Sequence, residues 1–123
     1  MLPEHSDVTK ACPAVNAILS RIGDKWSVLI VMELAKAPRR FNELKRDVDG
    51  ISQRMLTLTL RGLERDGLVS RKVFDTVPPK VEYALTDLGR SLQEPVMALG
   101  NWAILNRDRI HTAQADFDKR NAN

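Results

Sequence analysis

The stretch from Ile51 to Val69 constrains the fold of this chain more than any other segment. Ser52 stands where a helix would begin, because its hydroxyl can accept from a backbone N–H that the first turn leaves free. Gly67 can end the same helix in the left-handed conformation. Between them, apolar side chains recur on one side at helical spacing. These are Leu56, Leu60 and Leu63. We therefore predict a capped amphipathic helix followed by a strand.

The opposite side of this helix is polar and partly basic. Its exposed positions are expected to be Gln53, Arg54, Thr57, Arg61, Glu64 and Arg65, of which the first four are the candidates for base contact. Arg can contact guanine through two hydrogen bonds, Gln can do the same with adenine, and Thr can contact thymine. A helix that faces only solvent would more often alternate Glu and Lys. The pattern therefore favours a helix that contacts bases in the major groove, with Arg54 the strongest candidate.

Positive charge is concentrated around this segment. Between Lys36 and Lys80 there are eleven Lys and Arg residues against six Asp and Glu, whereas the rest of the chain carries eight against ten. A local surplus of this kind is typical of a surface that binds a polyanion. At 123 residues and 43% apolar composition, the chain has the size of one domain with a real core.

The other segments supply the remaining parts of a winged helix-turn-helix. Helices are predicted over residues 13–22, 25–36 and 42–48, and the second of these is apolar almost all round. Strands at 68–74 and 80–85 form a hairpin around a Pro-containing loop. A long helix follows Thr86 and ends near Ile110. The predicted fold is mainly α with a small β-hairpin, in which a domain at 12–110 lies between a flexible arm (1–11) and a flexible tail (111–123).

Further basic residues flank the predicted reading helix and are candidates for the DNA backbone. Arg39 and Arg40 precede the short helix that would cross that backbone, although a solvated surface pair fits the pattern as well. Lys80, with Arg71 or Lys72 at the base of the hairpin, would reach a minor groove or its phosphates. Ser52 is first a helix cap and second a phosphate contact.

Several motifs in fixed order together resemble the HxlR-type transcription regulators, which belong to the MarR-like superfamily. The resemblance rests on Cys12-Pro13, Gly23-Asp24-Lys25-Trp26, Arg40-Phe41-Asn42-Glu43-Leu44, Gly50-Ile51-Ser52-Gln53-Arg54-Met55-Leu56, Leu63-Glu64-Arg65-Asp66-Gly67-Leu68-Val69 and Pro78-Pro79-Lys80-Val81-Glu82-Tyr83-Ala84-Leu85-Thr86. One departure is Asp24, where the family usually has a second glycine.

The resemblance implies a homodimer that binds a pseudo-palindromic operator in double-stranded DNA. It also implies that the N- and C-terminal helices form the dimer interface. The apolar residues expected there are Val15, Leu92, Val96, Leu99 and Trp102. Intramolecular packing is the alternative for some of them. Repression and activation both fit such a protein, and we expect a repressor.

Cys12 has two interpretations. As a small apolar residue it would simply be packed. As the N-cap before Pro13, however, it lies where the helix dipole and free N–H groups stabilise a thiolate, and Lys10 adds positive potential. Many regulators that resemble this chain use a cysteine here to sense oxidants or electrophiles. Because the chain has no second cysteine, a disulfide would have to be intermolecular or formed with a small thiol.

Other classes of function have less support. Two isolated histidines and one cysteine have no metal-ligand spacing. An enzyme would use Cys12 with His5 or His111 as its base, but both histidines lie in segments expected to be flexible, and no orienting group or oxyanion hole can be proposed. We therefore expect no catalytic site, metal or cofactor. The main alternative is a winged-helix protein-interaction module without sequence-specific DNA binding. No signal peptide or membrane span is visible, so a cytoplasmic protein is expected.

Overall fold

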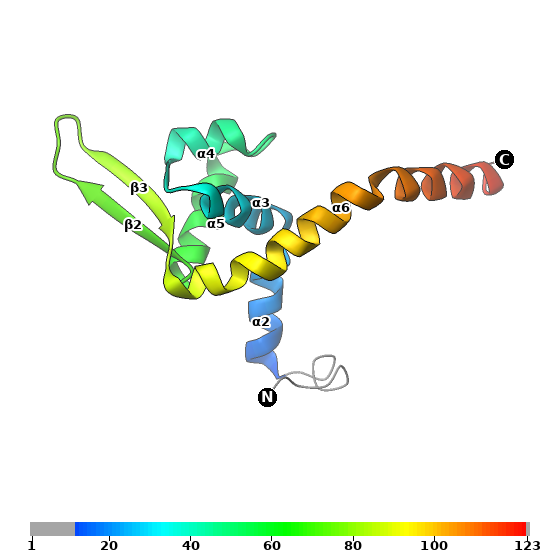
Figure 1. Cartoon of the computed structure of the whole chain (residues 1–123), viewed down its shortest axis with the longest axis horizontal. Coiled ribbons are helices and arrows are strands. Elements are labelled where there is room, and N and C mark those ends of the chain that lie inside the picture. The colour runs from blue at the N-terminus through cyan, green and yellow to red at the C-terminus, as the bar shows by residue number, and fades with distance from the viewer. Residues whose placement is uncertain (1–11, 123) are drawn as a thin grey trace.

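The computed structural model describes residues 12–122, so the arm expected at residues 1–11 lies outside the described residues. Five helices and three strands follow one another along this part of the chain (Figure 1). In order they are α2 (Pro13–Ile22), α3 (Lys25–Lys36), β1 (Arg39–Arg40), α4 (Phe41–Asp47), α5 (Gln53–Arg65), β2 (Val69–Phe74), β3 (Lys80–Leu85) and α6 (Asp87–Arg120). The prediction of a mainly helical winged helix-turn-helix is confirmed.

The sheet has three antiparallel strands in the order β1-β3-β2, so a third strand joins the predicted hairpin. Arg39 lies opposite Tyr83 and Arg40 opposite Glu82, so β1 pairs with the middle of β3. A strand of two residues is too short for alternation of side chains to show in a sequence. The pairing places the start of α4 beside the middle of β3, one strand of the wing, which is the β2–β3 hairpin.

The core gathers around α3, as its nearly continuous apolar surface predicted. Ile30, Val31 and Leu34 are buried in a cluster with side chains from α4, α5, α6, β2 and β3, and Ile22 of α2 packs against this cluster. The apolar side of α5 supplies the residues that the sequence assigned to it, Leu56, Leu60 and Leu63. Burying these side chains holds α5 against the domain and leaves its other side exposed.

The two turns that flank α5 each depend on a glycine. Gly50, in the turn before α5, has a φ of 83°, and Gly67, which follows it, has a φ of 78°. Residues other than glycine rarely adopt this backbone conformation, because their Cβ atom would come too close to the carbonyl oxygen. The prediction that Gly67 ends the helix in the left-handed region is confirmed.

The C-terminal helix is longer than predicted. The sequence indicated an end near Ile110 and a frayed tail, but α6 continues to Arg120 and projects away from the rest of the molecule (Figure 1). The residues after Gly100 include neither glycine nor proline, so nothing local stops the helix, even where its surface is polar. The division of the chain into arm, domain and tail stays a prediction.

Candidate nucleic-acid interface

The start of α5 is built by one serine. The Ser52 hydroxyl accepts a hydrogen bond from the Met55 N–H at 3.0 Å, which confirms its role as the N-cap. The side chains of the first two turns then project from a helix whose opposite face is buried. All four predicted base-contacting residues are exposed: Gln53, Arg54, Thr57 and Arg61. Within the described part of the chain, neither Arg54 nor Arg61 forms an ion pair, so both guanidinium groups are available to a ligand.

Two details of α5 were not visible in the sequence. The Thr57 hydroxyl donates to the Gln53 carbonyl oxygen at 2.9 Å, which leaves its methyl group and an acceptor lone pair for a partner. Leu58, assigned to neither side of the helix, is exposed within the polar face. Periodicity alone could have placed Leu58 on that face, since it follows Arg54 by four residues.

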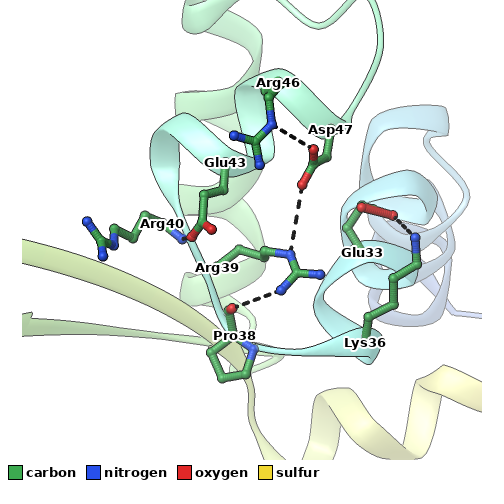
Figure 2. Close-up of polar contacts among 8 residues, drawn as sticks. All are labelled: Glu33, Lys36, Pro38, Arg39, Arg40, Glu43, Arg46 and Asp47. Carbon is green, nitrogen blue, oxygen red and sulfur yellow. Dashed lines mark hydrogen bonds and ion pairs between the residues drawn. The ribbon is translucent and has the colours of Figure 1, made fainter.

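The two arginines of β1 differ in their surroundings (Figure 2). The Arg39 side chain is only 23% exposed, its Nη1 donates to the Pro38 carbonyl oxygen at 3.4 Å, and its Nε lies 3.9 Å from Asp47 Oδ2. Arg40 instead donates its backbone N–H to Glu43 Oε1 at 2.8 Å, and its guanidinium points away from this cluster. Of the two, Arg40 is the one whose charge is free for a phosphate.

The register of the wing sorts its basic residues between the two faces of the sheet. Lys72 and Arg40 both lie opposite Glu82, and Lys80 lies opposite Phe74, so these three basic residues share one face. Arg40 and Lys80 also line one cavity of about 240 Å³. Arg71 lies opposite Tyr83, on the face that turns toward the core. Period-two alternation in β2 could have paired Lys72 rather than Arg71 with Lys80.

Cys12 is exposed and forms the N-cap of α2, with Pro13 as the first helical residue, as predicted. Its carbonyl oxygen accepts the first hydrogen bond of the helix, from Asn16 N–H at 3.1 Å. Within residues 12–122 of one protomer, the Cys12 thiol is therefore not packed against the core. Lys10, the expected source of positive potential, lies outside the described residues.

The residues predicted to form a dimer interface fall into two groups. Val15 on α2 is exposed, and so are Leu99 and Trp102 on α6, at 56% and 57%. Leu92 is partly buried against the core. Val96 is only 5% exposed because it packs inside the protomer, so its assignment to the interface needs correction. The exposed apolar set also includes residues that the sequence did not single out, namely Ile18, Leu19, Ile104 and Leu105.

Asp24 shows why the departure from the usual glycine is tolerated. Its φ of −68° and ψ of 136° are accessible to any residue, and its carboxylate caps α3 by accepting from the Trp26 and Ser27 N–H groups at 3.1 and 3.2 Å.

Within residues 12–122, no three His, Cys, Asp or Glu side chains cluster as metal ligands. No helix in the same range is long and apolar enough to cross a bilayer.

Comparison with known proteins agrees with this architecture. The model of the HxlR-like helix-turn-helix family matches residues 21–111. This chain belongs to that family. The HTH-type transcriptional regulator YdeP of Bacillus subtilis is 44% identical over 110 residues, which cover 89% of this chain and 85% of YdeP.

Two similar solved structures are of redox-related proteins. The redox regulator HypR in its oxidized form is 46% identical, with a TM-score of 0.72 over 77% of this chain and 97% of HypR. Diamide-treated YodB from B. subtilis is 36% identical, with a TM-score of 0.66 over 77% of this chain and 94% of that structure. At these identities the likeness extends beyond the fold to the family.

Proposed function

We propose that this chain is a DNA-binding transcriptional regulator that reads its operator with α5. The observation that carries the proposal is the exposed polar side of a capped helix inside the HxlR-like fold, on which Arg54 and Arg61 form no ion pair with any described residue. Arg54 and Gln53 project from its first turn, where a recognition helix contacts base edges. Arg40 and Lys80 supply separate positive charge for phosphates.

Selection of DNA fragments by the purified protein, followed by sequencing, tests this proposal. We expect an enriched pseudo-palindrome, with an affinity that falls steeply with salt yet stays above that for random duplex. Lack of sequence preference at every salt concentration would instead support the protein-interaction module. Transcription from the selected operator, measured with and without the protein, distinguishes repression from activation.

The proposal includes a homodimer formed by α2 and α6. Exposed apolar side chains on both helices support it, because a monomer would leave Leu99, Trp102 and Leu105 in water. A two-fold dimer would present its two α5 helices to successive major grooves, about 34 Å apart. Sedimentation equilibrium measures the mass, and a monomer at micromolar concentration would contradict this part of the proposal.

We also propose a cytoplasmic location. A response to oxidants or electrophiles through Cys12 is a further part of the proposal. It is supported by the exposure of the thiol at the start of α2 and by the similarity to HypR and YodB. Diamide should release the wild-type protein from its operator and leave Cys12→Ser bound. Equal release of both proteins would show that Cys12 does not sense the oxidant, and a small effector would then have to be sought.

A further inference from the structure

Helix α2 is attached to the domain mainly through its last turn. None of its residues is fully buried, and only Arg21 and Ile22 are partly so. Ile22 packs against the core, and Ile18 and Ile22 line an apolar cavity of about 270 Å³ between α2 and α6. Within one protomer, the orientation of α2 relative to the domain therefore depends on a small number of contacts near residue 21.

Arg21 joins this last turn directly to α5 in two ways. Its Nε donates to Asp66 Oδ2 at 2.9 Å, and the two side chains are only 36% and 33% exposed. Its guanidinium also lies against Gly62, so closely that a methyl group at residue 62 would overlap it. Gly62 lies inside α5 on the buried side. Arg21 thus contacts α5 both by charge and by shape.

The residue that caps α6 also contacts the end of α5. Thr86, the N-cap of α6, donates its hydroxyl to the Gly67 carbonyl oxygen and its N–H to the Leu68 carbonyl oxygen. Asp66, the C-cap of α5, therefore contacts α2 through its side chain, and the two residues that follow it contact the cap of α6. A 13-residue helix is about 20 Å long, so a rotation of about 5° at this end displaces the other end by about 2 Å. Such a displacement is enough to break hydrogen bonds to bases.

We propose that Arg21 is a positioning residue that sets the orientation of α5 relative to α2. Through Asp66 and Gly62 it aligns the helix that carries Gln53 and Arg54 with the helix that begins at Cys12. The inference rests on the proposed role of α5 in reading DNA. It adds a defined mechanical link by which a movement of α2 reaches the base-contacting residues.

Three variants disrupt this link differently, and each is assayed for operator affinity, random-duplex affinity and melting temperature. Arg21→Met removes both contacts, Asp66→Asn removes the charge, and Gly62→Ala displaces the guanidinium while raising helix propensity. The matched control is Arg90→Met. It also removes an Arg–Asp ion pair, in this case within α6, where Arg90 Nη1 lies 3.2 Å from Asp87 Oδ1. We expect the ratio of operator to random affinity to fall about fivefold in the three variants and less than twofold in the control.

The decisive variant is Gly62→Ala, because its melting temperature should stay equal or rise while its affinity ratio falls. A merely structural role for Arg21 predicts the opposite, namely a lower melting temperature in Arg21→Met with unchanged ratios throughout. The double variant Arg21→Met/Asp66→Asn should have the same affinity ratio as Arg21→Met alone, because Arg21→Met already removes the ion pair with Asp66. Fully additive losses would contradict the proposed link.

A second measurement needs no DNA. Spin labels at Ala17→Cys and Glu64→Cys, both exposed, report the distance between α2 and α5 in a Cys12→Ser background diluted with unlabelled protein. Arg21→Met and Gly62→Ala should broaden the distance distribution, and Arg90→Met should not. Unchanged distributions would overturn the proposal. If the wild type shows no sequence preference for DNA, the proposed role of α5 in reading DNA is contradicted. The distance measurement still tests whether Arg21 orients α5 relative to α2.

Discussion

At the scale of single residues, the surroundings of each arginine decide what its charge can do. Arg39 is engaged by Asp47 and by the Pro38 carbonyl oxygen, whereas Arg40, its neighbour in sequence, points away from both. Arg54 has no acidic partner among the described residues. We therefore expect different roles for these three arginines: Arg54 contacts bases, Arg40 contacts phosphates, and Arg39 mainly pairs with Asp47.

We expect Arg54→Ala to lower operator affinity about tenfold or more, because a bidentate contact to guanine contributes roughly 1–3 kcal/mol of discrimination. The affinity for random duplex should fall much less. Fluorescence anisotropy with both DNAs measures the two effects. A uniform loss on both duplexes would reassign Arg54 to phosphate contact.

Arg40→Ala should reduce the slope of log affinity against log salt by about one, because one phosphate contact is lost. The matched change Arg39→Ala should reduce the slope by less than half of that, since the Arg39 guanidinium is already engaged by Asp47. Titrations at four salt concentrations compare them. Equal slopes for the two variants would show that the ion pair with Asp47 opens on DNA binding.

At the scale of elements, side-chain oxygens define three helix starts. Ser52, Asp24 and Thr86 each accept hydrogen bonds from backbone N–H groups of the following helix. These caps were predictable, because the atoms involved are at most three residues apart and no distant part of the chain is needed. The pairing of β1 was not predictable, because it depends on a partner more than forty residues away.

The Asp24 cap provides a test at this scale. Asp24→Ala should lower the free energy of unfolding by about 1 kcal/mol, and Asp24→Gly, which introduces the usual residue of the family, by only a few tenths. Urea denaturation followed by circular dichroism measures both. Asp75→Ala is the control, since Asp75 is exposed and has no polar partner within residues 12–122. A comparable loss in that control would show that the cap contributes nothing specific.

At the scale of the whole molecule, α6 has two parts with different surroundings. Its N-terminal part packs on the core through Leu92 and Val96, whereas its C-terminal part projects from the domain (Figure 1). Along the same helix, Leu99, Trp102 and Leu105 are exposed. Exposed apolar side chains on a projecting helix are costly unless a partner covers them. This shape is the physical reason to expect a second copy.

Leu99→Asp should therefore dissociate the dimer and leave a helical protomer, because an exposed position tolerates a charge. Val96→Asp, one turn earlier, should unfold the protomer, since a buried unpaired charge costs several kcal/mol. Sedimentation equilibrium and circular dichroism separate the two outcomes. A dimer that survives Leu99→Asp would place the interface elsewhere.

The sequence by itself determined the local features of this protein. Helix starts, the left-handed Gly67, the polar side of α5 and the alternation of β3 each depend on residues within one or two turns of one another, so their pattern is visible along the chain. The family resemblance, carried by motifs in fixed order, belongs to the same level.

Only the tertiary structure decided which of these residues are free to act. It assigned Val96 to the core, engaged Arg39 with Asp47, separated Arg71 from Lys80 and brought Arg21 against Gly62 and Asp66. It also extended α6 beyond the predicted end. Exposure and ion pairing depend on side chains that are distant in sequence, and no local pattern records which of them will meet.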